Sequence, residues 1–129
     1  MVAGRIKNTD TNPKTHYGIT KPSLGLIPKV ALEAQAAALQ LGENKYGPWN
    51  WRDDSVSASV YINAMMRHIQ EWKEVEDNDP DTNASHLGNV MACCAILLDA
   101  QANGCLIDDR PKGAKNEDGA NFSDVEKDD

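Results

Sequence analysis

The sequence predicts an all-α protein whose helical bundle is completed by self-association. Three segments place apolar residues at helical spacing, and each is bounded by residues that begin or end helices. No segment shows the alternating pattern of a strand, and no internal repeat is present. A chain of 129 residues is long enough for one domain with a modest core. Because three helices bury little apolar area, we expect copies of this domain to associate.

The N-terminal part is predicted as an extended arm followed by the first helix. In residues 1–27, prolines and glycines recur, and basic residues outnumber the single acidic residue, Asp10. The helix is expected to begin with Pro28 in its first turn and to end near Gly42. One face combines small and apolar residues and permits close approach of another helix: Val30, Ala34, Ala37, Ala38 and Leu41.

Two further helices are predicted on either side of an Asp-Pro turn. Residues 45–54 are expected to form a loop, because Gly47-Pro48 interrupts regular structure. The second helix is expected at roughly 57–76 and the third at about 84–103, with Asn103-Gly104 as its C-terminal cap. The centre of the third helix, "VMACCAILL", is nearly all apolar and is predicted to form the core. Residues 28–111 thus form the predicted helical domain, and 112–129 an acidic tail predicted to be disordered.

Charge and composition restrict the classes of function. Lys and Arg number 13 against 20 Asp and Glu, and the net charge of -7 repels polyanions, so nucleic acid is not an expected partner. A small anionic ligand carried by divalent cations remains compatible with this charge. The three cysteines lack a metal-site spacing and are typical of reduced thiols. No apolar run has the length of a membrane span or a signal peptide, so we expect a cytoplasmic protein without membrane association.

The corner between the second and third helices concentrates groups that bind metal ions. His68 and Glu71 lie three residues apart, as do Glu71 and Glu74, so each pair points toward a common region. His86 and Asn89 repeat this spacing on the third helix. An antiparallel helix pair brings such sets face to face, as in the carboxylate metal sites of helical bundles. Oxygen and imidazole donors suit Mg²⁺ or Mn²⁺.

Other interpretations of this corner remain open from the residues alone. Acidic residues near a helix end are normally part of a solvated surface. Asp79-Pro80-Asp81 is close enough to reach the same ions, but it is equally suited to forming the turn and capping the third helix. His86 is as well suited to capping or packing, and His68 alone would be taken for a core histidine. The convergence of these groups, rather than one residue, favours a site.

The motifs around the corner resemble a known family. "LGLIP", "GENKYGPWNWR", "YINAMMRHIQEWKEVEDNDPD", "SHL" and "LIDDRP" follow one another as in MazG-like nucleoside triphosphate pyrophosphohydrolases, and most closely as in the phage dATP/dGTP diphosphohydrolase (MazZ) branch. The resemblance spans about residues 21–111, with Val75 where glycine is usual. It implies a MazG-like helical bundle completed by oligomerisation, as a homodimer or homotetramer.

The resemblance also implies ion ligands and catalytic groups. The E-x-x-E and E-x-x-D signatures of MazG-like proteins correspond to Glu71-x-x-Glu74, or His68-x-x-Glu71, and to His86-x-x-Asn89. Because His and Asn replace acidic residues there, Glu76 and Asp79 are expected to supply the missing anionic ligands. Two or three Mg²⁺ or Mn²⁺ ions per site are implied. The implied ligands are His68, Glu71, Glu74, Glu76, Asp79, His86 and Asn89. Either Glu71 or Glu74 is the implied proton acceptor.

The reaction implied by the resemblance is hydrolysis of a purine deoxynucleoside triphosphate, dGTP or dATP, to the monophosphate and pyrophosphate. The implied nucleotide-binding residues are Lys45, Asn50, Trp51, Arg67 and Asp109. Lys45 and Arg67 are candidates for phosphate contacts, as is Arg52. An aromatic residue of the "KYGPWNW" segment is expected to stack on the base, with Asn50 reading its edge. "IDDRP", which contains Asp109, is expected to fold across the pocket.

Several functions remain compatible with these features. Members of this branch supply dGMP in phages that replace adenine with 2-aminoadenine, and the same chemistry also suits general cleansing of the nucleotide pool. A pyrophosphohydrolase for pyrimidine nucleotides is a second reading. A non-catalytic helical adaptor that binds a metal or a basic partner is a third, and it predicts that Glu71 and Glu74 point into solvent.

Overall fold

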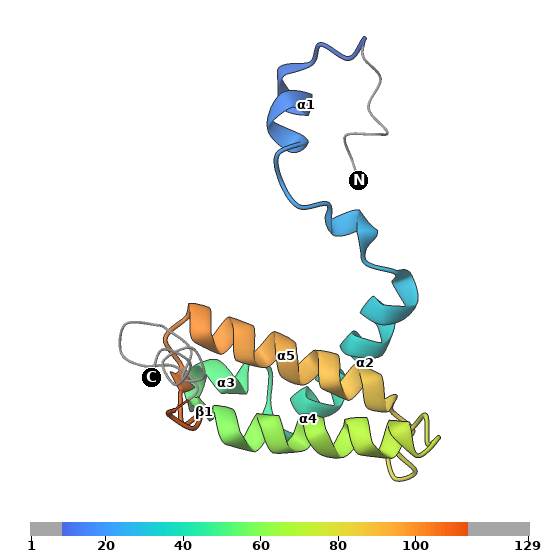
Figure 1. The fold of residues 1–129 in the computed structure, drawn as a ribbon, viewed down its shortest axis with the longest axis vertical. Helices are drawn as coiled ribbons and strands as arrows, with labels where there is room; N and C mark the ends of the chain where they lie inside the picture. The colour runs from blue at the N-terminus through green and yellow to red at the C-terminus, as the bar shows by residue number, and fades with distance from the viewer. Residues whose placement is uncertain (1–8, 114–129) are drawn as a thin grey trace, which may run out of the picture. The chain divides into compact units, whose positions relative to one another are not determined.

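The computed structural model describes residues 9–113. The elements follow the chain as α1 (Pro13–Gly18), η2 (Leu24–Leu26), α2 (Lys29–Tyr46), α3 (Asn50–Asp53), β1 (Val56–Ser57), α4 (Ala58–Lys73), α5 (His86–Ala102) and β2 (Leu106–Ile107) (Figure 1). The predicted all-α class is confirmed. The chain divides into two compact units between residues 33 and 34, inside α2. The predicted acidic tail lies, from residue 114 onward, outside the described residues.

The N-terminal unit contains a short helix where an extended arm is predicted. Asn12 caps α1, because its side-chain oxygen accepts a hydrogen bond from the Lys14 amide at 2.9 Å, and Pro13 occupies the first helical turn. The Asp10 carboxylate accepts a further hydrogen bond from the Thr15 hydroxyl at 2.9 Å. An Asn-Pro pair is a helix-start signal, and the recurrent prolines and glycines concealed it.

Helices α4 and α5 form an antiparallel pair, pack against each other more extensively than any other two elements of residues 9–113, and carry three of the six buried apolar residues (Figure 1). Their bounds agree with the predicted second and third helices to within a few residues. Ser85 caps α5, since its hydroxyl oxygen accepts from the Gly88 amide at 3.0 Å. The buried apolar residues are almost all alanines, so the helices approach closely: Ala38, Val56, Ala58, Ala84, Ala92 and Ala100.

Helix α2 runs past the predicted end. It continues through Gly42 to Tyr46, and Gly47 follows with φ +88°. A single glycine inside a helix costs only about 1 kcal/mol, whereas the left-handed conformation at Gly47 and Pro48 beyond it end the helix. Part of the predicted loop is also helical, as α3. In the second unit α2 approaches α5 closely, where Gly88 faces the Ala34 backbone.

A short parallel strand pair joins the start of α4 to the segment after α5, in a chain predicted to lack strands. Val56 pairs with Leu106, and the Val56 amide donates to the Cys105 carbonyl at 3.0 Å. The C-terminal cap at Asn103-Gly104 is confirmed, with Gly104 at φ +72°, and it reverses the chain toward β1. Strands of two residues carry no periodic pattern, which is why the sequence did not reveal them.

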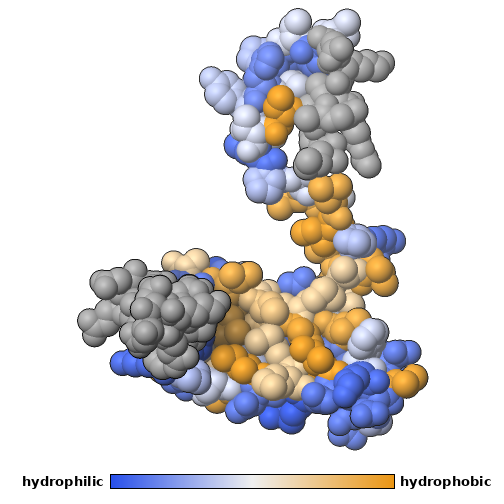
Figure 2. Space-filling view, viewed as in Figure 1, coloured by the Kyte–Doolittle hydropathy of each residue, from blue (hydrophilic) through white to orange (hydrophobic). Residues whose placement is uncertain are grey.

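Large apolar side chains remain on the surface of the second unit. None of the described residues with a large side chain is completely buried. Figure 2 shows a continuous apolar area over α5. The exposed large apolar residues on α4 and α5 are Val60, Met66, Ile69, Trp72, Leu87 and Leu98. Across residues 9–113, no helix combines the length and the apolar content needed to cross a membrane.

Candidate active site

A chain of three hydrogen-bonded side chains lies at the corner between α4 and α5. His86 is 2% exposed and begins α5, and its Nε2 lies 2.8 Å from Oε1 of Glu76. Its Nδ1 lies 2.9 Å from Nδ1 of His68, which comes from α4. The structure therefore brings together His68, Glu76 and His86, three of the predicted ion ligands.

The hydrogen-bond partners indicate which ring nitrogens of His86 and His68 carry a proton. An ionised carboxylate only accepts hydrogen bonds, so His86 Nε2 donates to Glu76. The Nδ1 of a neutral His86 then accepts from the Nδ1–H of His68. Burial lowers the pKa of His68, as do His86 and Arg67, while the Asp79 carboxylate opposes them. His68 thus keeps a lone pair on Nε2, which is available to an ion or a proton.

The turn between the helices is built by its own backbone. The Asp79 amide donates to the Ala84 carbonyl at 2.8 Å, and its Oδ1 accepts from the Asp81 amide at 2.8 Å. The His86 amide donates to the Asp77 carbonyl at 2.9 Å, which fixes Glu76 beside the imidazole. Val75 lies at φ +68°, a conformation that favours glycine. Asp79 therefore shapes the turn, and Ser85 rather than an aspartate caps α5.

The remaining predicted ligands are less closely gathered. Glu71 and Glu74 are exposed, and Glu74 is the C-terminal cap of α4. The Asn89 amide nitrogen donates to the Ser85 carbonyl at 3.1 Å. Within residues 9–113, no three His, Cys, Asp or Glu side chains are placed to hold a metal ion by themselves. Any ion at this corner needs ligands from outside this set.

A small pocket is lined by residues of α2, α3, α4 and α5. It has a volume of about 230 Å³ and is lined by Tyr46, Asn50, Val60, Tyr61, Ala64 and Cys93. Burial raises the pKa of Tyr61, with smaller contributions from Cys93 and Tyr46. Its phenol is therefore a neutral donor near pH 7. Asn50, a predicted nucleotide-binding residue, is part of this wall.

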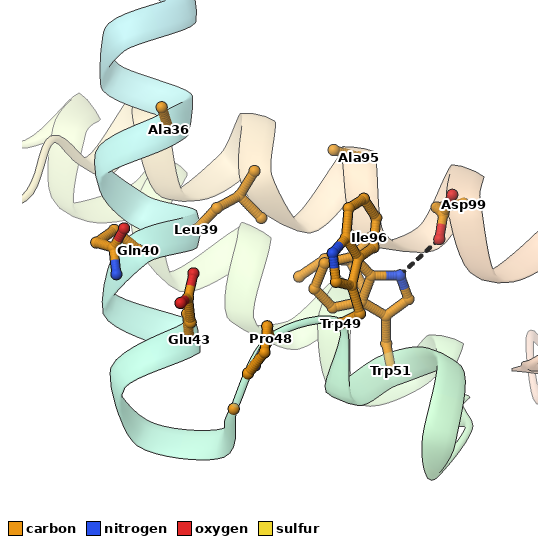
Figure 3. Close-up of a pocket in the computed structure, with 11 residues that line it drawn as sticks. Ala36, Leu39, Gln40, Glu43, Pro48, Trp49, Trp51, Ala95, Ile96 and Asp99 are labelled. Carbon is orange, nitrogen blue, oxygen red and sulfur yellow. Dashed lines mark hydrogen bonds between the residues drawn. The ribbon is translucent and has the colours of Figure 1, made fainter.

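A larger pocket of about 450 Å³ lies between α2, α3 and α5 and is lined by Trp49 and Trp51 (Figure 3); we call it the tryptophan pocket. The Trp51 indole donates to Oδ2 of Asp99 at 2.7 Å, and Arg52 forms a two-pronged ion pair with the same carboxylate. These contacts lower the Asp99 pKa to about 2, with Arg52 as the main cause. Arg52 also lies 4.4 Å from the ring centre of Trp49, which has φ +57°. Trp51 is thus held at a different pocket from Asn50.

Three predicted nucleotide-binding residues take separate positions. Asp109 accepts hydrogen bonds from the Ser59 amide, at 2.8 Å, and from the Ser59 hydroxyl, and so caps the N-terminus of α4. Lys45 is exposed in the last turn of α2. Arg67 is exposed on α4, where its charge contributes to the lowered pKa of His68 and opposes the rise in the Cys93 pKa that burial causes. Arg67 therefore lies within electrostatic range of both the corner and the small pocket. Tyr61 and Cys93 were missed as pocket residues, because their places on apolar helix faces are the only signal that marks them.

The fold and the corner define an α-helical domain with an imidazole–carboxylate site in a helix–turn–helix. Residues 11–110 match the family described as dATP/dGTP diphosphohydrolase, N-terminal, and the chain belongs to this family. It is also similar to a dATP/dGTP diphosphohydrolase of Salmonella phage PMBT28, with 29% identity over 90 residues, 70% of this chain. The match spans 30% of the length of that relative. No solved structure matches the chain. The family resemblance predicted from the motifs is confirmed.

Proposed function

We propose that this chain hydrolyses dATP and dGTP to the monophosphate and pyrophosphate at the corner between α4 and α5. The observation that carries the proposal is the hydrogen-bonded chain from Glu76 through buried His86 to His68. Family membership and the name of the phage relative support the substrate class. Supply of dGMP for 2-aminoadenine synthesis in a phage is one use of this reaction.

The residues of the corner fit Mg²⁺ or Mn²⁺ bound together with the substrate. In nucleotide enzymes Mg²⁺ is usually held by one or two carboxylates plus substrate phosphates, and not by a cage of protein ligands. A corner without three preassembled ligands is compatible with that arrangement. Together with the substrate phosphates, His68 Nε2 and the carboxylates of Glu76 and Asp79 would hold the ions, and these would neutralise the triphosphate and acidify the attacking water.

The protein side chains orient the reacting groups. His86 is held between Glu76 and His68, so it fixes the ring of His68 with Nε2 outward. Glu71 follows His68 by three residues and is its neighbour on the surface of α4, which makes it the candidate proton acceptor. Arg67 is the candidate contact for the phosphates. The water oxygen bonds to the α-phosphorus, its proton passes to the carboxylate, and pyrophosphate leaves.

We also propose that the protein works as a homodimer or homotetramer. The proposal is supported by the alanine core and by the large apolar side chains left exposed on α4 and α5. Light scattering at micromolar concentration tests it, and a stable monomer would contradict it.

The adaptor reading is the second candidate, since Glu71 and Glu74 are exposed as it requires. Glu76→Gln separates the two. Purified protein is incubated with dATP, dGTP, dCTP, dTTP or dUTP and Mg²⁺ or Mn²⁺, and pyrophosphate and monophosphate are quantified by ion-exchange chromatography. We expect turnover of the purine nucleotides, and a loss of about 10–100-fold in Glu76→Gln, because such partners orient the site.

The control is Asp53→Asn, an exposed carboxylate on α3 that loses the same charge. It should retain full activity. No turnover of any nucleotide with either ion would favour the adaptor. Equal or faster turnover of dCTP or dUTP would favour a pyrophosphohydrolase for pyrimidine nucleotides. Loss of activity in Glu74→Gln but not in Glu76→Gln would show that the catalytic site is formed by Glu71 and Glu74 and not by Glu76.

A further inference from the structure

We infer that the purine ring of the substrate binds in the small pocket of Tyr46, Asn50, Tyr61 and Cys93, and that the Asn50 amide reads its edge. This inference rests on the proposed function, since it places one end of the same substrate. Of the three aromatic residues that the sequence motif offers for base stacking, it selects Tyr46 instead of Trp49 or Trp51.

Helix register places this pocket in line with the corner. Tyr61 precedes His68 by seven residues on α4, and Cys93 follows His86 by seven on α5. Seven residues are nearly two helical turns, so each pair shares one face and is roughly 10 Å apart along its helix. Because α4 and α5 are antiparallel (Figure 1), both displacements run in the same direction, away from the corner. The interval accommodates a deoxyribose and the first phosphate between base and corner.

The pocket has the size and walls of a base site. Its 230 Å³ is below the ~300–1,000 Å³ of sites that enclose a whole ligand, so it suits one part of a nucleotide. Two tyrosines line it, and aromatic rings are the usual surfaces on which bases stack.

Asn50 explains why both purines are suitable. Among residues 9–113 its side-chain amide forms no hydrogen bond, whereas its backbone carbonyl accepts from the Asp54 amide. An amide offers one donor and one acceptor. In one orientation it matches the O6 and N1–H of guanine, and after a half-turn it matches the N1 and N6–H of adenine.

The tryptophan pocket, which is lined by Trp49 and Trp51, lies on the side of α5 that faces away from His86. Ala95 and Asp99 line it, and they follow His86 by nine and thirteen residues. These spacings turn them roughly 180° and 140° around the helix from His86. The Trp51 indole is also engaged by Asp99. A base in that pocket would face away from the corner.

Asn50→Asp tests the assignment through base preference. A carboxylate offers only acceptors, which suit the N1–H and amino donors of guanine and repel N1 of adenine. We expect the ratio of kcat/KM for dGTP to that for dATP to rise roughly 10-fold or more. Asn63→Asp, an exposed asparagine on α4, is the matched control and should leave the ratio unchanged.

Binding of dGMP and dAMP, followed by calorimetry, tests the pocket without catalysis. Tyr46→Ala should weaken both by roughly 10-fold, since stacking on one aromatic ring contributes about that much. Tyr46 is 69% exposed, so the variant is expected to fold, and circular dichroism verifies this. Absence of turnover with intact, Asn50-dependent binding would refute the proposed function alone. Turnover with an unchanged base ratio in Asn50→Asp, or no binding of either monophosphate to the wild type, would overturn the pocket.

Discussion

Replacing Gly88 by alanine tests the contact between α2 and α5 that frames the second unit. A Cβ atom at Gly88 would lie 2.6 Å from the Ala34 carbonyl oxygen and 3.0 Å from its carbon. Both are backbone atoms, so no side-chain rotation relieves the overlap. The two helices must separate by several tenths of an ångström.

The expected cost follows from two opposing contributions. Overpacking of this kind costs about 1–3 kcal/mol, and alanine recovers about 1 kcal/mol of helix propensity relative to glycine. Gly88→Ala should therefore lower the free energy of unfolding by up to about 2 kcal/mol. Gly42→Ala is the matched control, because no atom lies within 4 Å of a Cβ there. It should stabilise by about 1 kcal/mol through propensity alone.

Urea unfolding followed by far-ultraviolet circular dichroism measures both variants at one protein concentration, because association affects apparent stability. The two changes should have opposite signs, with unchanged slopes. If Gly88→Ala stabilises as much as Gly42→Ala, α2 does not pack against α5 at this position and the tryptophan pocket is not enclosed as described.

Two further outcomes follow from the same geometry. The Asp99 pKa is lowered to about 2 from 3.8, so its ion pair with Arg52 stabilises the fold above pH 4 and this contribution is lost as the pH falls toward 2. The stability difference between wild type and Asp99→Asn, from thermal melts, should shrink over that interval, and a constant difference would contradict the pairing. Val75 lies at φ +68°, so Val75→Gly relieves about 1–2 kcal/mol of backbone strain in the folded state. The greater conformational entropy of glycine in the unfolded chain opposes this gain by about 0.5–1 kcal/mol. A small rise in melting temperature is expected, and a fall would show that the valine side chain is needed.

The helix boundaries illustrate which predictions a sequence supports. The starts of α4 and α5 were predicted to within a few residues, and so was the Asn103-Gly104 cap, because apolar periodicity and turn residues are local signals. The groups that cap the two starts, Asp109 and Ser85, were not predicted. The end of α2 was placed too early at Gly42, since a glycine is tolerated within a helix when the residues around it favour one. Helix α1 was missed although Asn12-Pro13 announces it.

The candidate site shows the same division. The sequence located the corner, but it did not separate Glu76, which meets His86, from Glu71 and Glu74, which remain exposed. All three lie within six residues, and a difference of one or two positions turns a helical side chain to another face.

The sequence by itself determined the all-α class, the family and the segment that contains the imidazole and carboxylate groups, because periodicity, caps and ordered motifs are properties of neighbouring residues. Only the tertiary structure decided which of these groups meet. The antiparallel register of α4 and α5 pairs His68 with His86, and the packing of α3 places Asn50 and Trp51 at different pockets. The hydrogen bond from the Ser59 amide at the start of α4 to Asp109, which lies fifty residues further along the chain, was likewise decided by the tertiary structure. Such contacts depend on how distant segments pack, and that information is absent from local patterns.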